Sequence, residues 1–107
     1  MVNTDNVSFP ITVEEFTALQ RAELGREPSK MEKEFFAEIV GLANDSFNAA
    51  AHGDADAVQD ILSAINAVPT PTDYERHLSA LCRGWVLLGC RQGMEILKAA
   101  IDGTIYS

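Results

Sequence analysis

Apolar residues recur every three or four positions along most of this chain, which is the spacing of one face of an α-helix. Thr12, Ser29 and Thr72 are each followed three residues later by a glutamate, and this arrangement is a capping box that starts a helix. Glycines follow the first two apolar runs, and Pro69 cannot continue the third. These signals predict helices over about 13–24, 30–51, 55–67 and 72–102, with an N-terminal arm over 1–11 and a tail over 103–107.

The predicted helix over 72–102 is the most informative segment, because its apolar positions cover roughly half of its circumference. These positions are Leu78, Leu81, Cys82, Trp85, Val86, Leu88, Ile96 and Leu97. An arc this wide has to be buried, either against the other helices or against a second chain. Gly89 and Gly93 leave open whether the helix breaks there, although their spacing would also let another helix approach closely.

The fold class follows from these helices, because no strand signal competes with them. Pro10 interrupts the one stretch with strand character, residues 7–13. The chain has 107 residues, which is enough for one domain with a modest core. We therefore expect a single all-α domain over 1–107, a small four-helix bundle-like fold with the long C-terminal helix as its spine.

Charge narrows the range of partners. The net charge is −8, so we expect no direct binding to nucleic acid, which requires a basic surface. Residues 1–75 hold 14 acids and 4 bases, whereas residues 76–107 hold 2 acids and 4 bases. No apolar stretch is long enough for a membrane span and no secretion signal opens the chain. With Cys82 and Cys90 expected as reduced thiols, these features predict a cytoplasmic protein.

Three acids form a stripe on the predicted second helix. Glu34, Glu38 and Asp45 project within about 40° of one another, opposite an apolar arc. One interpretation is an ordinary solvated face behind a core face. The other is an electrostatic surface for a basic partner, because regularly spaced carboxylates on a rigid helix can imitate phosphates.

Half of all the bases lie on one side of the C-terminal helix. Arg76, Arg83, Arg91 and Lys98 fall within an arc of about 80°. They either pair with acids on other helices of the same chain or meet the acidic stripe of a second copy. In the second case Leu81, Trp85, Leu88 and Ile96 would supply the buried contact, although a lone tryptophan is more often a core residue.

Catalytic signals are weak. His52 is expected at the end of the second helix, and His77 lies near the start of the last one, without a neighbouring nucleophile. The spacing of the histidines and cysteines does not suit zinc, and no glycine-rich phosphate loop is present. We therefore expect no catalytic, cofactor-binding or metal-binding residues. The sequence favours a non-catalytic interaction or adaptor domain that forms a homodimer through its C-terminal helix. The alternative is an acidic inhibitor, of the kind that phages encode, that mimics nucleic acid.

Overall fold

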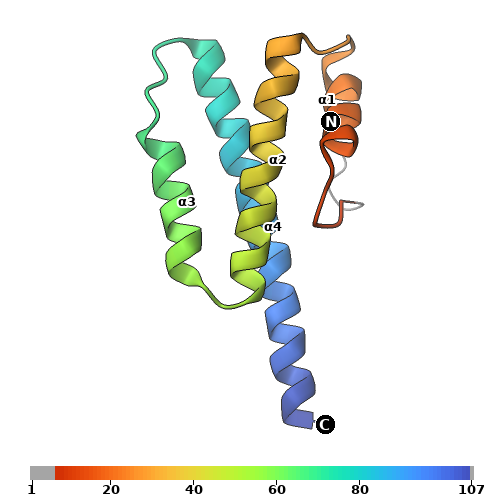
Figure 1. Cartoon of the computed structure of the whole chain (residues 1–107), viewed down its shortest axis with the longest axis vertical. Coiled ribbons are helices and arrows are strands. Elements are labelled where there is room, and N and C mark those ends of the chain that lie inside the picture. The colour runs from red at the N-terminus through yellow and green to blue at the C-terminus, as the bar shows by residue number, and fades with distance from the viewer. Residues whose placement is uncertain (1–6, 107) are drawn as a thin grey trace.

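The structure is a computed structural model that describes residues 7–106, and within this range the chain forms four α-helices and no β-strand (Figure 1). The helices are α1 (Val13–Leu24), α2 (Lys30–Ala51), α3 (Ala55–Ala67) and α4 (Asp73–Tyr106). This confirms the small all-α bundle with a long C-terminal helix.

The helices pack around one central pair, α2 and α4. These two helices run in the same direction and cross, while α3 carries the chain back from the end of α2 to the start of α4 (Figure 1). The short α1 lies on the other side of the central pair from α3. The long helix α4 and its neighbour α2 therefore form the centre of the fold.

The helix starts match the capping signals in the sequence. The hydroxyls of Thr12, Ser29 and Thr72 each accept a hydrogen bond from the backbone N–H three residues later, at 3.1 to 3.2 Å. Gly25 ends α1 in the left-handed conformation at a φ of 68°, which a residue with a side chain rarely adopts. Local capping chemistry thus sets the starts of α1, α2 and α4 and the end of α1.

The helix α4 continues through Gly89 and Gly93 without a break. These two glycines are the points at which α2 passes against α4. A Cβ atom on Gly89 would lie 2.6 Å from the carbonyl oxygen of Ala43. One on Gly93 would meet the carbonyl oxygen of Phe47 and lie 2.8 Å from the Cβ of Ala50. The close approach suggested by the glycine spacing therefore occurs within the chain, between α4 and α2.

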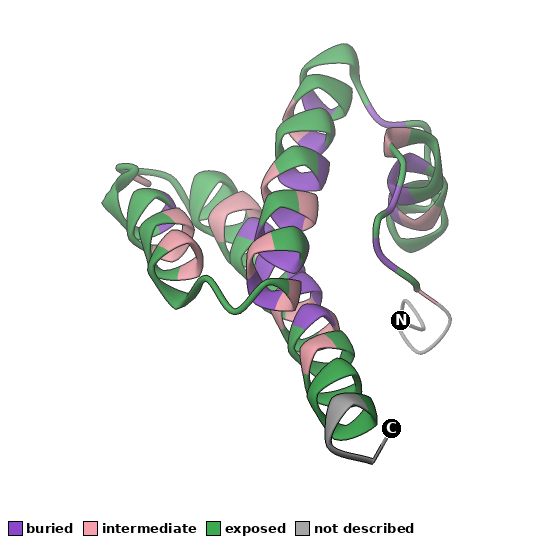
Figure 2. Cartoon of the chain, turned by 60° about the horizontal axis from the view of Figure 1, so that its bottom comes forward, coloured by how far each residue is buried: buried purple, intermediate pink, exposed green. Residues whose placement is uncertain are grey.

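Aromatic side chains fill the core on either side of this crossing. The ring of Phe16 packs edge-on against Phe36 and against Trp85, with ring centroids 5.3 and 4.9 Å apart. Phe9 of the N-terminal arm stacks on Phe47 at 5.7 Å. Figure 2 shows the buried positions of α2 and α4 gathered on the sides where the two helices meet. Burial of these rings stabilises the α2–α4 pair and attaches α1 and the arm to it.

Two side-chain amides, those of Asn44 and Gln92, hold the arm over residues 7–11. The Asn44 side chain accepts from the backbone N–H of Ile11 and donates to its carbonyl, both at 2.9 Å. The Gln92 side chain accepts from Phe9 at 3.1 Å and donates to Val7 at 2.7 Å. These hydrogen bonds satisfy backbone groups that have no helical partner. The arm is therefore fixed in place against α2 and α4.

The C-terminal end of α4 extends beyond the other helices (Figure 1). We expected the helix to end at Gly103, but it continues to Tyr106. Gly25 and Gly53 are the described glycines with positive φ, so Gly103 does not form a left-handed cap. A glycine within a helix costs up to about 1 kcal/mol relative to alanine and does not have to end it. No helix in the described range is long and apolar enough to cross a membrane.

Candidate interaction surfaces

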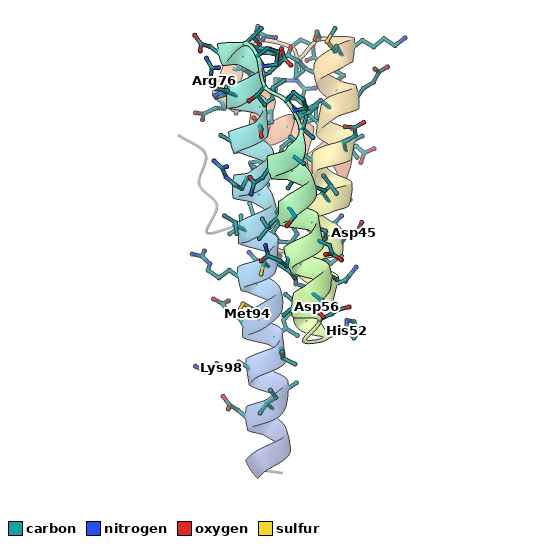
Figure 3. All side chains as sticks on the ribbon, turned by 90° about the vertical axis from the view of Figure 1, so that its left-hand side faces the viewer. Asp45, His52, Asp56, Arg76, Met94 and Lys98 are labelled. Carbon is teal, nitrogen blue, oxygen red and sulfur yellow. The ribbon has the colours of Figure 1, made fainter. Side chains whose placement is uncertain are left out.

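The side of α4 that faces away from the bundle carries bases and large apolar residues in alternation. We call this surface the outer stripe; its members are Arg76, Arg83, Leu87, Arg91, Met94, Lys98 and Ile101. All seven are exposed, and Leu87, Met94 and Ile101 keep 47%, 59% and 51% of their surface accessible. Figure 3 shows Arg76, Met94 and Lys98 projecting from the same side of α4. The sequence identified the four bases, but the apolar residues between them were missed.

The bases of the outer stripe do not pair with acids on other helices. Arg76 forms an ion pair with Asp73, one turn earlier on α4. Arg83 donates a long hydrogen bond of 3.5 Å to the Asn66 side chain on α3. Across residues 7–106, Arg91 and Lys98 have no ion pair. Of the two interpretations from the sequence, pairing with acids on other helices is therefore not seen among the described residues, and Arg91 and Lys98 are free to meet another molecule.

The four apolar interface candidates from the sequence differ in accessibility. Trp85 is only 6% exposed and packs against Phe16, which places it in the core. Leu81 and Leu88 are half-buried, and Ile96 is half-exposed. Of these four, only Ile96 offers a largely accessible side chain.

A second surface is a groove between α2, α3 and α4, with a volume of about 310 Å³. We call it the α2–α3–α4 groove; its lining residues are Phe35, Glu38, Ile39, Leu42, Ala64, Ile65, Val68, Pro69, Thr70, Glu75, Leu78, Ser79 and Cys82. Most of these are apolar, two are acids, and none is a base. The groove was not predicted, because it depends on how closely α3 packs against the α2–α4 pair.

Cys82 is a buried residue that lines this groove. Burial raises the pKa of its thiol, and the negative charge of nearby Glu38 raises it further. The thiol is therefore protonated at neutral pH and is a poor nucleophile. Cys82 contributes apolar surface to the groove.

The acidic stripe on α2 is exposed to solvent. Glu34, Glu38 and Asp45 have no ion pair within the described part of the chain. In Figure 3, Asp45 projects from the side of the molecule opposite to Arg76 and Lys98. The molecule therefore presents bases on one side and acids on another.

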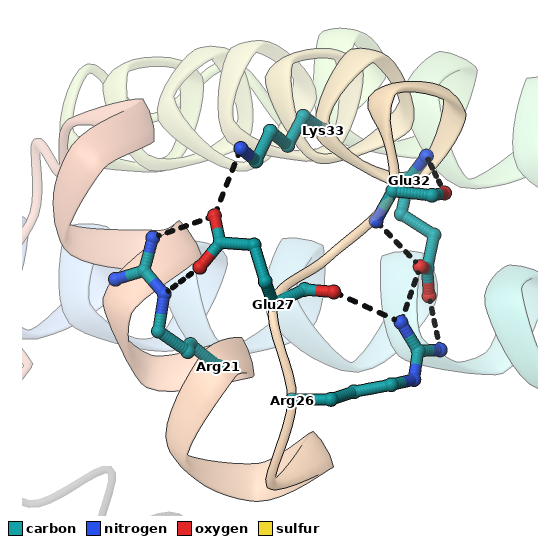
Figure 4. A network of polar contacts seen from close by, with 6 residues as sticks. Arg21, Arg26, Glu27, Glu32 and Lys33 are labelled. Atoms are coloured by element: carbon teal, nitrogen blue, oxygen red, sulfur yellow. Dashed lines mark hydrogen bonds and ion pairs between the residues drawn. The ribbon is translucent and has the colours of Figure 1, made fainter.

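A polar network joins the start of α2 to its neighbours (Figure 4). The carboxylate of Glu32 accepts from both terminal nitrogens of Arg26, at 2.8 and 3.0 Å, from the backbone of Ser29 at 2.9 Å, and from the Tyr74 hydroxyl at 3.2 Å. The hydrogen bonds from Arg26 lower the pKa of Glu32 to about 2, and those from Ser29 add to the effect. The sequence indicated the Ser29 cap but not the bonds to Arg26 and Tyr74. The network consists of satisfied structural contacts.

Beside it, Glu27 bridges two bases. Its carboxylate accepts from Arg21 at 2.6 Å and from Lys33 at 2.9 Å. The bond from Arg21 lowers the pKa of Glu27 to about 2, with a further contribution from Lys33. These contacts connect α1 to the start of α2 and involve only exposed side chains, so they are weak.

Groups suited to catalysis or metal binding are dispersed. His52 caps α2, where its Nδ1 lies 2.7 Å from the carbonyl of Asn48, and His77 is exposed. Within residues 7–106, no three histidine, cysteine, aspartate or glutamate side chains gather in a way that could hold a metal ion. The outer stripe and the α2–α3–α4 groove are the surfaces on which a functional argument can be built.

Comparisons with protein-family models, with curated proteins and with solved structures find no match.

Proposed function

We propose that this chain is a small, acidic, non-catalytic interaction domain that associates with itself through its C-terminal helix, α4. The supporting observation is that Leu87, Met94 and Ile101 form an exposed row at seven-residue intervals. Single exposed apolar residues need no explanation. A row repeated every two turns is typical of a helix that packs against another helix.

The position of the row modifies the interface expected from the sequence. Because Trp85 lies in the core, the proposed contact uses the outer stripe in place of Leu81, Trp85 and Leu88. Arg83, Arg91 and Lys98 flank the apolar row and would orient the partner through their charge. Since α4 also extends beyond α2 and α3, its end is accessible to a second molecule (Figure 1).

The test is the molar mass from light scattering after gel filtration, at several concentrations, in low and high salt, with reductant. We expect a species of at least twice the chain mass of 11.6 kDa that survives reductant. Replacing Met94 with glutamate should return the protein to a folded monomer. Met31→Glu is the matched control, because Met31 is 75% exposed on α2, away from the outer stripe. A wild-type chain that stays monomeric throughout would refute the proposal.

The proposed compartment is the cytoplasm. Cys82 is buried and Cys90 is half-buried, and both thiols are free. Free thiols persist where the surroundings are reducing. Including reductant in the test therefore reproduces that state and removes disulfide-linked dimers from the result.

The acidic stripe on α2 supports a second candidate function, inhibition of a nucleic-acid-binding protein by imitation of phosphates. Glu34, Glu38 and Asp45 are exposed, rigidly spaced and unpaired, as such a surface requires. The test is binding of a captured basic partner by the wild-type chain and by a variant in which all three acids become lysine. This function requires the variant to remain folded and to lose the partner, and retained binding would exclude it.

A further inference from the structure

We infer that the α2–α3–α4 groove of one molecule receives the outer stripe of a second molecule, so that copies join head to tail. The inference rests on the proposed self-association and goes further by naming the receiving surface. Three observations support it: both surfaces are apolar, their charges are opposite, and they lie on different parts of the molecule.

The first argument is the fit between an apolar groove and an apolar row. Phe35, Leu42 and Leu78 are half-buried in the groove, and Val68 at its edge is 60% exposed, so a covering helix would remove apolar surface from water. An amphipathic helix commonly binds a groove through anchors one or two turns apart. Leu87, Met94 and Ile101 have this spacing.

The second argument is charge. The groove carries Glu38 and Glu75 and no base. The Glu75 carboxylate accepts a hydrogen bond from Thr72 at 2.9 Å, but neither acid has an ion pair in the described range. The apolar row is flanked by Arg83, Arg91 and Lys98, the last two also without an ion pair. Opposite charges favour a basic helix as the occupant of the groove and would fix its register.

The third argument is placement. The groove and the outer stripe share no residue, so one molecule can offer both surfaces at once. A two-fold dimer of outer stripe against outer stripe would bring the bases of both copies together, which is unfavourable. Asp45 on α2 projects from the side opposite to Arg76 and Lys98 on α4 (Figure 3), so one two-fold contact cannot match these acidic and basic sides with each other. A head-to-tail contact matches them and can extend into chains or close into rings.

The experiment uses two variants that each remove one surface. Met94→Glu disables the outer stripe. The double variant Glu38→Lys with Val68→Lys disables the groove by adding charge that repels the bases, at two exposed positions that the fold tolerates. Circular dichroism and denaturant unfolding confirm that both variants are folded. Glu34→Lys is the matched control, since Glu34 is an exposed acid on the same helix that does not line the groove.

Light scattering then gives the mass of each variant alone and of their equimolar mixture. We expect each alone to be a monomer, because each lacks half of the contact. The mixture should form a 1:1 dimer of about twice 11.6 kDa, because the Met94→Glu chain keeps its groove and the groove variant keeps its stripe. The Glu34→Lys control should self-associate as the wild type does.

The other outcomes overturn the inference in distinguishable ways. A groove variant that self-associates like the wild type would leave the proposed function standing and exclude the groove as the receiving surface. A mixture that stays monomeric would show that the stripe and the groove do not bind each other. A monomeric wild type would refute both the self-association and the head-to-tail contact, leaving the groove to an occupant of another sequence.

Discussion

The inner and outer faces of α4 are both rich in apolar residues, yet they lie in opposite environments. On the inner face, Trp85 and Val86 are buried against other helices, and Gly89 and Gly93 allow α2 to pass at close range. On the outer stripe, Leu87 and its neighbours in the row remain exposed between unburied bases. Both faces are apolar, so apolar content does not distinguish them. The face of α4 that packs within the chain is distinguished by small residues, which let the backbone of another helix approach closely.

The assignment of the two faces of α4 is tested most directly by removing one large side chain from each face. Trp85→Ala should lower the free energy of unfolding by about 3–5 kcal/mol, because it empties a buried space beside Phe16. Leu87→Ala should change it by less than about 0.5 kcal/mol, because Leu87 is exposed. Denaturant unfolding at a concentration where the chain is monomeric measures both. Equal costs for the two variants would contradict the assignment of the faces.

A second pair of variants tests the role of the glycines. Gly93→Ala should lower the free energy of unfolding by about 1–3 kcal/mol, because the new methyl group meets the carbonyl of Phe47 and the Cβ of Ala50. Gly84→Ala is the matched control on the outer side of α4, where a Cβ has open space. It should raise stability by up to about 1 kcal/mol through better helix propensity. If both substitutions stabilised the protein, the close approach of α2 and α4 would be refuted.

Much of the fold could be predicted from the sequence, because it is encoded locally. Capping residues such as Ser29 and Thr72 and the left-handed cap at Gly25 act within one turn, and they set the helix boundaries. Part of the wide apolar arc of α4 is buried within the chain, at Cys82, Trp85 and Val86, whereas Ile96 stays 50% exposed. The prediction that α4 ends at Gly103 was wrong, because a glycine signals a helix end only where the chain adopts positive φ.

The candidate surfaces were less predictable, because they depend on which helices meet. The four bases on α4 were visible from spacing, but their lack of ion pairs with other helices in the described range follows from the packing of α2 and α3 elsewhere on α4. The row of Leu87, Met94 and Ile101, which lies between these bases, is also visible in the sequence as apolar residues at seven-residue intervals. This spacing is the signal that the sequence analysis missed. The groove has no local signal, since three helices and a loop contribute to it.

A third prediction concerns the polar contacts of the inner side, which hold the arm. Gln92→Ala should lower the free energy of unfolding by about 1–2 kcal/mol, because it leaves the backbone groups of Val7 and Phe9 without their partners. Hydrogen exchange at the Phe9 amide should also accelerate. Glu95→Ala, one turn away at an exposed position, is the control and should change neither quantity measurably. An unchanged Phe9 exchange rate in Gln92→Ala would show that the arm is held by other contacts.

The smallest predicted effect is a pH dependence at the start of α2, where Arg26 and Ser29 donate hydrogen bonds to the carboxylate of Glu32. The pKa of Glu32 is about 2 in the folded chain, below its ordinary value of 4.5. A lowered carboxyl pKa stabilises the folded state above pH 4.5, and this contribution is lost as the pH falls through 2. At neutral pH, Glu32→Gln should therefore lower the free energy of unfolding by about 1 kcal/mol, since its charged hydrogen bonds to exposed Arg26 become neutral.

The measurement for this last prediction is denaturant unfolding of both chains from pH 7 to pH 2. The difference between wild type and Glu32→Gln should shrink as the pH falls below 4.5, because the carboxylate of the unfolded wild-type chain becomes protonated there while that of the folded chain stays charged until about pH 2. Glu27 keeps its own lowered pKa in both chains, so its contribution cancels in the difference. Glu34→Gln, an exposed acid without an ion pair on the same helix, is the control and should follow the wild-type curve. A difference that stayed constant down to pH 2 would mean that the charge of Glu32 does not stabilise the start of α2.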